Sequence, residues 1–356
     1  MDADGPSSEV ALSTRARLAR NIADIPFPTH ARDADLKRAA DVVLDAVYAA
    51  GESEQRIGAL RVIHPSRLSE FERLALVDAR VTSRRHVDGG RYRPIVLNET
   101  GTLSLMVNEE DHLRIQCILP GLQPMTAVQM AREFDSILAG KIRYARTDNL
   151  GYLTSSLSNI GTGFRLSVMV HLGGLSFLKE AVPTLAAAAE LRISIRGLFG
   201  EGTKAFGDIF QVSNETTIGF SEKEIASRVR AAAEHLVSRE KEARRRIVSE
   251  KKDELADAVE QVRSRINEAC VLTARDAVAI VSILRLADEA GLKPGVSPKE
   301  FSGLLVSMRL GNSAAGGRAT VAMSDDVKRA KLLREKVNES GDALQLAFFD
   351  GREQDS

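Results

Sequence analysis

The stretch Glu110-Asp-His-Leu-Arg-Ile-Gln-Cys-Ile-Leu119 alternates polar and apolar residues with a period of two. One face carries Leu113, Ile115, Cys117 and Leu119, and the other carries Glu110, His112, Arg114 and Gln116. This pattern predicts a β-strand, because successive side chains of a strand point to opposite faces of a sheet. A strand with one wet and one buried face is typical of an antiparallel sheet rather than of a parallel sheet covered on both sides.

Other segments repeat this alternation and place arginines on the polar face. Phe164–Leu172 has Arg165, Ser167, Met169 and His171 on that face, and Leu191–Arg196 has Arg192, Ser194 and Arg196. If Val10–Arg17 is also extended, Arg15 and Arg17 share a face. The guanidinium fork binds phosphate oxygens bidentately, so several such strands predict an anion-binding surface. Periodicity alone leaves open the alternative that these are ordinary solvated charges.

Composition narrows the classes of protein to consider. The chain has 356 residues, which favours two domains, and Lys+Arg and Asp+Glu both number 49. The zero net charge argues against a general polyanion binder, so no direct nucleic-acid binding is expected. No stretch has the roughly 20 apolar residues that span a bilayer, so we expect a soluble, cytoplasmic protein without a membrane contact. Cys117 and Cys270 form no disulfide framework, and we expect both thiols to be buried.

The order of expected elements divides the chain in two. Helical spacing predicts helices over 33–50 and 65–83, and a hairpin joins Ile95–Leu97 to Leu103–Val107. Ser221 and Glu224 form a predicted capping box that opens a long charged helix reaching about residue 252. Further helical patterns continue to residue 290. We therefore expect a catalytic domain over 1–240 and a helical domain over 241–356.

Two glycine-rich segments fail as standard nucleotide motifs. Gly197–Lys204 has the glycine spacing of a P-loop but has Thr and Lys in the wrong order, and Asn159–Gly163 lacks the third glycine of a dinucleotide fingerprint. Any nucleotide is therefore expected to be held by arginines.

Five segments carry a family resemblance. They are Ser13-Thr-Arg-Ala-Arg-Leu-Ala-Arg20, Val107-Asn-Glu-Glu-Asp-His-Leu-Arg-Ile-Gln116, Gly151-Tyr-Leu-Thr154 with Asn159-Ile-Gly-Thr-Gly163, Arg196-Gly-Leu-Phe-Gly-Glu-Gly-Thr203, and Ile209-Phe-Gln-Val-Ser-Asn214. In them the chain resembles the ATP:guanidino phosphotransferases (phosphagen kinases), most closely the bacterial protein-arginine kinases of the McsB type. The resemblance implies an α+β fold, in which an antiparallel sheet flanked by helices is followed by a helical C-terminal domain.

The resemblance also implies ATP as the phosphoryl donor, with Mg²⁺ bridging the nucleotide oxygens and no metal site built from protein ligands alone. Nucleotide-binding residues would be Ser13, Thr14, Arg15, Ala16, Arg17, Arg80, Arg114, Arg165, Leu166, Ser167, Val168, Met169, Arg196, Gly197, Leu198, Phe199, Gly200 and Glu201. Five of these arginines would clamp the phosphates (Arg15, Arg17, Arg114, Arg165 and Arg196), because charge spreads over the phosphoryl oxygens in the transition state. Glu110 and Glu201 would grip the acceptor guanidinium, with Glu110 as the base and Glu201 as the orienting partner.

The sequence departs from the family pattern at three places. Ser156 replaces a cysteine whose thiolate would add negative charge near the guanidinium, so we expect a weaker enzyme. Arg80 stands where a nucleotide-contacting histidine is usual, and it can still stack on adenine. The regulatory phosphoarginine motif of this branch is altered to Asp325, Asp326, Arg329 and Ala330, in which the first aspartate would repel phosphoarginine.

Three functions remain open at this point. The first is a protein-arginine kinase that marks proteins for Clp-type degradation in stress response, with an McsA-like activator, a Clp ATPase and a second copy of the chain as partners. It is favoured because the large N-terminal domain of phosphagen kinases is missing, Met169 replaces a histidine, and a helical domain is added. The second is a kinase of a free guanidino compound, and the third is a catalytically weakened adaptor.

Overall fold

The fold, in a computed structural model, is described over residues 5–51, 57–197, 207–292, 326–335 and 337. Its main sheet has eight strands in the order β2-β3-β4-β5-β1-β8-β10-β9, and every neighbouring pair is antiparallel. The strands are β1 (Ala11–Arg20), β2 (Leu60–Ile63), β3 (Ile95–Asn98), β4 (Leu103–Val107), β5 (Leu113–Pro120), β8 (Phe164–His171), β9 (Ile193–Gly197) and β10 (Ile209–Asn214). A separate hairpin pairs β6 (Arg146–Thr147) with β7 (Gly151–Tyr152). The predicted antiparallel sheet is confirmed.

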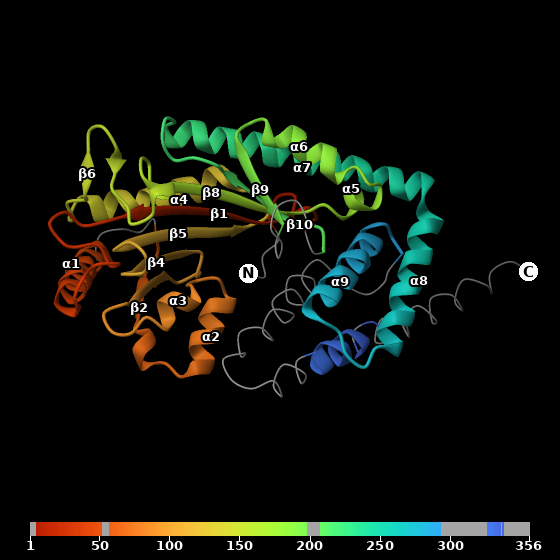
Figure 1. Cartoon of the computed structure of the whole chain (residues 1–356), viewed down its shortest axis with the longest axis horizontal. Coiled ribbons are helices and arrows are strands. Elements are labelled where there is room, and N and C mark those ends of the chain that lie inside the picture. Colours follow the sequence, from red (N-terminus) through yellow and green to blue (C-terminus); the bar gives the residue numbers. More distant parts are fainter. Residues whose placement is uncertain (1–4, 52–56, 198–206, 293–325, 336, 338–356) are drawn as a thin grey trace, which may run out of the picture.

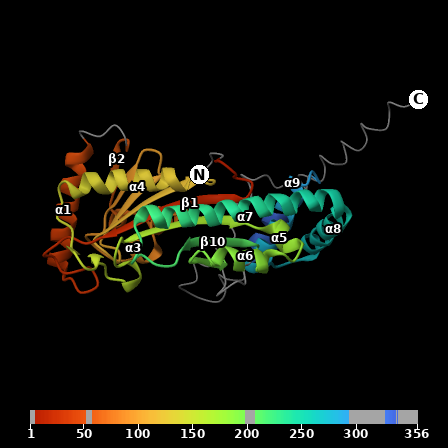
Figure 2. The same ribbon diagram turned by 90° about the horizontal axis from the view of Figure 1, so that it is seen from above.

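Two helices, α4 (Pro124–Ala139) and α7 (Glu222–Glu250), cover one face of the central strands (Figures 1 and 2). The described helices are α1 (Asp33–Gly51), α2 (Glu70–Asp78), α3 (Arg84–Val87), α4 (Pro124–Ala139), α5 (Gly173–Phe177), α6 (Ala181–Ala189), α7 (Glu222–Glu250), α8 (Lys252–Glu268) and α9 (Ala274–Glu289). Helix α4 packs on β1 and β5, and α7 packs on β8 and β10. The apolar face of the sheet forms the main core against these two helices, which leaves the other face of the central strands for the polar side chains.

The N-terminal strand lies at the centre of the sheet. In β1, Thr14, Ala16 and Leu18 are fully buried beneath the helices. The intervening Arg17 pairs with Gln116 of β5 on one side and with Arg165 of β8 on the other. Directly paired residues of an antiparallel sheet lie on the same face, so the register places Arg17 beside Arg165, and Arg114, two residues before Gln116, on the same face.

The predicted strand over 110–119 begins too early. β5 starts at Leu113, and Glu110, Asp111 and His112 belong to the turn that precedes it. His112 does not share the wet face of Arg114, as its ring is fully buried and hydrogen-bonded to the backbone of Ile22 and Pro26. The alternation of polar and apolar residues extends into this turn by chance, but the backbone of the turn is not extended, so the alternation does not predict where these side chains point.

Of the predicted helices, those over 33–50 and 221–252 are confirmed as α1 and α7, and the Ser221 capping box is present. The single helix predicted over 65–83 is wrong. A 3₁₀ turn over Pro65–Arg67 is followed by a new start at Ser69, whose own capping box opens α2. A Ser with Glu three residues later satisfies free amides at a helix start, so it divides the apolar pattern into two elements.

The helical part of the chain packs against the end of the sheet (Figure 1). Helix α7 runs without a break through residue 240, where the domain boundary was predicted, and α8 and α9 fold back from its end. A second core joins α8 and α9 to Ile209 of β10 and to Met169 of β8. Of the two cysteines, Cys117 is buried as expected, whereas Cys270 is exposed, which corrects that expectation.

Candidate active site

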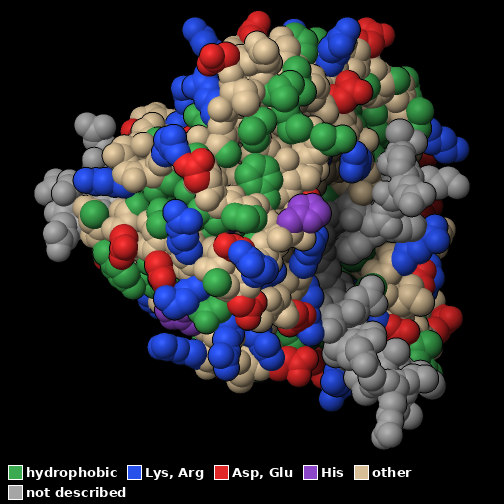
Figure 3. All heavy atoms as spheres, turned by 60° about the vertical axis from the view of Figure 1, so that its left-hand side comes forward, with side chains coloured by type: hydrophobic (Ala, Val, Ile, Leu, Met, Phe, Trp, Pro, Cys, Tyr) green, Lys and Arg blue, Asp and Glu red, His purple; other side chains and the backbone are tan. Residues whose placement is uncertain are grey.

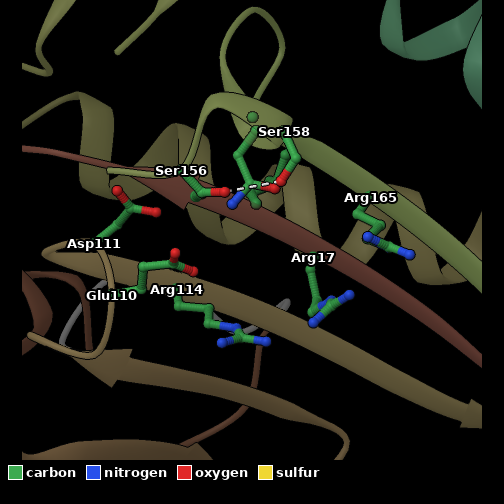
Figure 4. A pocket seen from close by; sticks show the side chains of 11 residues that line it. Arg17, Glu110, Asp111, Arg114, Ser156, Ser158 and Arg165 are labelled. Carbon is green, nitrogen blue, oxygen red and sulfur yellow. Dashed lines mark hydrogen bonds between the residues drawn. The ribbon is translucent and has the colours of Figure 1, made fainter. Parts of the chain in front are cut away.

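Arginines from β1, β5 and β8 point into one space on the sheet face away from the helices. Figure 4 shows Arg17, Arg114 and Arg165 around this space, with Glu110 beside Arg114. Arg15 lies two residues before Arg17 on the same strand and therefore on the same face. Arg196 of β9 joins this arginine face from the sheet edge, because it pairs with Gln211, which pairs with Met169 of β8.

These guanidinium groups are crowded enough to affect one another. Burial, followed by the neighbouring charges of Arg114, Arg80 and Arg165, lowers the pKa of Arg15 to about 9. Burial and the same kind of repulsion lower the pKa of Arg17 well below its usual value. For Arg165, burial and then Arg196 and Arg114 lower the pKa. The mutual repulsion of these guanidinium groups disfavours their charged forms, so a bound polyanion would relieve the repulsion.

Two donors on this face lack a protein acceptor. The Nε atoms of Arg15 and Arg165 are buried and have no hydrogen-bond partner within the described residues. A buried unsatisfied N–H costs free energy, and such groups cluster where a ligand completes them. The arginine face therefore fits a triphosphate by charge, by geometry and by its unused donors.

The turn between β4 and β5 is held by the Asn108–His112 run. Asn108 adopts a left-handed backbone conformation, with φ of 57°, and its side chain donates to the carbonyls of Leu36 and Tyr92 at 2.8 and 2.7 Å. His112 Nδ1 accepts from the amide of Ile22 at 3.1 Å, and burial lowers the pKa of this ring to about 4, so it is neutral at pH 7. Asp111 accepts from Asn21 Nδ2 at 2.7 Å and from the amide of Ser155 at 2.7 Å. Three of the five side chains thus fix the turn, which leaves Glu109 and Glu110, and of these two Glu110 lines the cavity described below.

Glu109 is a site residue that the sequence reasoning missed. Its carboxylate, 5 % exposed, accepts from Arg114 Nη1 at 2.7 Å, from Ser83 Oγ at 2.7 Å and from the amide of Glu110 at 2.9 Å. Burial alone would raise the pKa of Glu109, but Arg114 and these hydrogen bonds outweigh burial and lower it to about 2. The adjacent glutamates Glu109 and Glu110 indicated a second carboxylate at this position, but sequence alone does not say which of the two faces the cavity and which binds Arg114.

Glu110 and the arginines meet at a cavity of about 150 Å³ (Figure 4). Its walls are Arg17, Leu18, Ala19, Glu110, Asp111, Arg114, Ser156, Ser158, Asn159, Gly163 and Arg165. Ser155 Oγ donates to the carbonyl of Glu110 at 2.7 Å and ties the segment before the cavity's serines to the β4–β5 turn. Ser156 and Ser158 share a hydrogen bond of 2.9 Å between their hydroxyls. The structure thus brings Glu110 and Ser156 together with three of the five predicted phosphate-binding arginines.

The other predicted nucleotide-binding residues fall into two groups. Ser13, Ser167 and Met169 lie on the arginine face, and Gly197 ends β9. Thr14, Ala16, Leu166 and Val168 are fully buried toward the helical layer, so only their backbone atoms are available to a ligand. The hydroxyl of Thr14, for example, donates to the carbonyl of Gly121 at 2.7 Å.

Arg80 reaches the same face from a turn outside the sheet. Its Nη1 lies 3.7 Å from Met169 Sδ, and its carbonyl accepts from Gln116 Nε2 at 2.7 Å. It adopts a left-handed backbone conformation, with φ of 59°, and its charge contributes to the lowered pKa of Arg15. The side chain is therefore placed beside the arginine face, as the prediction requires.

Five predicted residues lie outside the described part of the chain, namely Leu198, Phe199, Gly200, Glu201 and Asp325. Of the altered phosphoarginine motif, Asp326, Arg329 and Ala330 are described, in a helical segment of the C-terminal part. Arg329 is buried, forms an ion pair with Asp326 and donates to the carbonyl of Leu272 at 3.1 Å. Its guanidinium thus binds this segment to the connection between α8 and α9.

Two further features concern metals and membranes. Within the described residues, no three His, Cys, Asp or Glu side chains come together as a metal-binding group. Over the same part of the chain, the helices are all too short or too polar to cross a membrane.

Comparisons with known proteins agree with this geometry. The sequence profile of the ATP:guanido phosphotransferase C-terminal catalytic domain matches residues 42–243, a range that starts after β1. Protein-arginine kinase from Pelotomaculum thermopropionicum is 38% identical over 340 residues, which is 94% of each chain. Protein-arginine kinase from Geobacillus stearothermophilus is 34% identical over 339 residues, 95% of this chain and 93% of its own.

Solved structures show the same fold. A lombricine kinase superposes with a TM-score of 0.55 at 23% identity, covering 68% of both chains. The duplicated taurocyamine kinase from Schistosoma mansoni gives a TM-score of 0.56 at 22% identity, over 66% of this chain and 33% of that chain. The profile match, the relatives and the arginine face with its glutamate lead to one conclusion: the chain belongs to the ATP:guanido phosphotransferase family.

Proposed function

We propose that this protein is an ATP-dependent protein-arginine kinase, which transfers the γ-phosphoryl group of ATP to arginine side chains of other proteins. The observation that carries the proposal is the meeting of Glu110 with Arg17, Arg114 and Arg165 around one cavity. An anion-binding surface next to a carboxylate is what a phosphoryl donor and a cationic acceptor need in order to react. The choice of a protein acceptor is supported by relatives of nearly full length that carry the name protein-arginine kinase.

In this proposal the chain's own residues position and neutralise the reactants. Arg15, Arg17, Arg114, Arg165 and Arg196 hold the phosphate oxygens, where negative charge accumulates as the phosphoryl group transfers. The acceptor arginine has no free lone pair until it loses a proton, and Glu110 takes that proton. A bond then forms between the acceptor nitrogen and the γ-phosphorus, the bond from that phosphorus to the ADP oxygen breaks, and ADP leaves. Glu201 is the orienting partner of the acceptor guanidinium in this proposal.

We include Mg²⁺ as the ion that accompanies ATP and neutralises charge between the phosphate groups. Within the described residues, the arginine face carries cations and no group of three carboxylates or other metal ligands, so the ion would be held chiefly by the nucleotide. Its residues therefore fit a metal–nucleotide complex rather than a free metal ion.

The setting of the enzyme is proposed from the family resemblance. We infer a cytoplasmic kinase of the stress response that marks proteins for a Clp ATPase, with an McsA-like activator where one is present. A homodimer through the helical domain over 241–356 is part of the same proposal. Arg329, already engaged with Leu272 and Asp326, argues that the altered motif binds phosphoarginine more weakly than the standard one.

A direct assay tests the function. The protein is incubated with Mg-ATP and either casein or free arginine, and acid-labile phosphate on nitrogen is measured. We expect labelled casein with the wild-type chain and a loss of at least about 100-fold in Glu110→Gln, because the proton acceptor is removed. Glu99→Gln, an exposed glutamate in the β3–β4 turn, is the matched control and keeps full activity.

Each other outcome identifies a different function. Turnover of free arginine without labelled casein would make the protein a kinase of a small guanidino compound. Absence of label on both acceptors would favour the adaptor, to which Ser156 and Asp325 already point.

A further inference from the structure

Ser83, which lies outside the sheet, is hydrogen-bonded to the carboxylate of Glu109. Glu109 in turn contacts both Arg114 and the backbone of Glu110. Ser83 immediately precedes α3, and its hydroxyl oxygen accepts from the amide of His86 at 3.2 Å, which makes it the N-cap of that helix. The same hydroxyl donates to Glu109 Oε1 at 2.7 Å. Ser83 therefore has two roles that can be separated chemically: it accepts a hydrogen bond as a helix cap, and it donates one to Glu109.

The two oxygens of Glu109 have different partners. Oε2 accepts from Arg114 Nη1 at 2.7 Å and from the amide of Glu110 at 2.9 Å. Oε1 is held by Ser83. Rotation of a carboxylate about its last torsion has broad, shallow preferences, so a partner on each oxygen is needed to fix its plane. Ser83 supplies the partner of Oε1.

The geometry points to Ser83 as a positioning residue for phosphoryl transfer: through Glu109 it sets both the Arg114 guanidinium and the backbone of Glu110. This inference rests on the proposed function, in which Arg114 contacts the donor and Glu110 the acceptor. Ser83 itself does not line the cavity. Its effect on catalysis is therefore indirect.

The neighbouring residues reinforce this connection. His86 Nε2 hydrogen-bonds the carbonyl of Val107 at 2.8 Å, and its Nδ1 hydrogen-bonds Thr82 Oγ1 at 2.9 Å. The short segment 82–86 is thus fastened to the end of β4 immediately before the Glu109 turn. Glu109 is 5 % exposed, so water does not readily replace the Ser83 hydroxyl.

Loss of this hydrogen bond should lower the rate of the chemical step more than the binding of ATP. A displacement of about 1 Å between reacting groups costs up to ~100-fold in rate, and a partial release of Glu109 should cost roughly tenfold. ATP binding depends on several arginines, and Arg114 keeps its bond to Glu109. We therefore expect KM for ATP to change by less than about threefold.

Three substitutions separate the cap from the donor. Ser83→Thr keeps both roles and should retain at least about half of wild-type kcat. Ser83→Asp keeps the cap, since Asp is a favoured N-cap residue, but replaces the donor by a second carboxylate next to Glu109. Ser83→Ala loses both roles. We expect Ser83→Asp and Ser83→Ala to lose roughly tenfold in kcat for casein labelling.

A pH profile gives a signature that a purely structural role would not produce. In Ser83→Asp the facing carboxylates would share a proton as the pH falls, and the protonated aspartic acid would again donate to Glu109. Its kcat, relative to wild type, should therefore rise toward acid pH, while the ratio for Ser83→Ala should stay flat.

Ser69→Ala is the control for helix capping. Ser69 caps the neighbouring α2 with a capping box, in which its side-chain partner is Glu72, and it does not line the cavity. The Ser69→Ala variant should lose about as much thermal stability as Ser83→Ala, and it should keep the wild-type kcat.

Wild-type kcat in Ser83→Asp at neutral pH would overturn the positioning role, and so would an equal loss in Ser69→Ala. A wild-type chain that labels no casein would overturn the proposed function together with it. Normal wild-type labelling that is lost in Glu110→Gln but kept in Ser83→Asp would overturn the positioning role alone.

Discussion

At the scale of single residues, Ser156 is the position where replacing one side-chain oxygen by sulfur should change kcat. It lines the cavity with Glu110, and its hydroxyl is bonded to that of Ser158 at 2.9 Å. A hydroxyl carries no charge near neutral pH, whereas a cysteine thiolate beside cations would add negative charge next to the acceptor guanidinium. We expect Ser156→Cys to raise kcat by about 3- to 10-fold in the casein assay, more strongly at alkaline pH. Ser156→Ala is the control, and an unchanged or lower rate in the Cys variant would contradict this account.

Alternation along strands predicted Arg15, Arg17, Arg114 and Arg165 on one face, and the structure brings these side chains together. The same reasoning could not separate Glu109 from Glu110. In a turn, neighbouring side chains diverge according to backbone dihedrals such as the positive φ of Asn108, and no periodicity reports these. The role of Ser83 could not be predicted for another reason, because Ser83 and its hydrogen-bond partner Glu109 are 26 residues apart in the sequence.

At the scale of elements, the turn between β4 and β5 depends on two neutral histidines. Burial lowers the pKa of both His86 and His112 to about 4, from an ordinary value near 6.5. As the pH falls from about 6.5 to 4, the unfolded chain takes up protons that the folded chain refuses, so folding stability falls across this range and levels off below it. We expect a loss of roughly 1–3 kcal/mol per histidine, visible as a falling Tm.

Thermal unfolding between pH 7 and 4.5 checks this. His112→Gln removes one titrating ring and should give a shallower slope, while His30→Gln, at an exposed position, should leave the slope unchanged. A Tm independent of pH over this range would show that these rings are not held neutral.

Elements with a local chemical signal were predictable, and those defined by distant partners were not. The capping box of Ser221 and Glu224 marks the start of α7 correctly. The same capping box at Ser69 and Glu72 lies inside a longer apolar pattern, so a single helix was predicted over 65–83 where the chain makes a 3₁₀ turn and a separate short helix, α2. The edge strand β2 has only four residues, partly buried on both faces, too few for a period-two signal.

At the scale of the whole molecule, Arg285 of α9 fastens the helical part to the start of the chain. Its side chain is 1 % exposed, donates to the carbonyls of Ser8 and Glu9 at 2.8 Å each, and pairs with Glu289 at 3.4 Å. Removing one member of a buried polar network leaves the others unpaired. We expect Arg285→Met to lower the free energy of unfolding by about 3 kcal/mol.

Urea denaturation measures this change. Arg265→Ala is the control, because its pair with Asp276 is on the surface and should contribute less than about 1 kcal/mol. Equal losses in the two variants would mean that the contact of α9 with the N-terminal segment adds no particular stability.

The general architecture could be predicted from sequence, but the order of strands could not. Half-wet alternation predicts an antiparallel sheet, and the helical texture after residue 221 predicts a helical second part. That β1, the first strand in sequence, lies between β5 and β8 follows only from contacts across more than 90 residues. The hydrogen bond of 2.8 Å between His171 of β8 and Ser282 of α9 also joins residues far apart in sequence. His171 was predicted on the solvated face of its strand, but it lies buried under α9.

The crowding of Arg15, Arg17 and Arg165 also has a practical consequence at the bench. A protein whose cations repel one another gains stability from any multivalent anion that fits between them, in proportion to the logarithm of its concentration. Phosphate or sulfate in a storage buffer would therefore compete with nucleotide for this site. It would raise the melting temperature and reduce the further rise that added nucleotide causes. Preparations kept in chloride or acetate would look less stable and would report the nucleotide more faithfully.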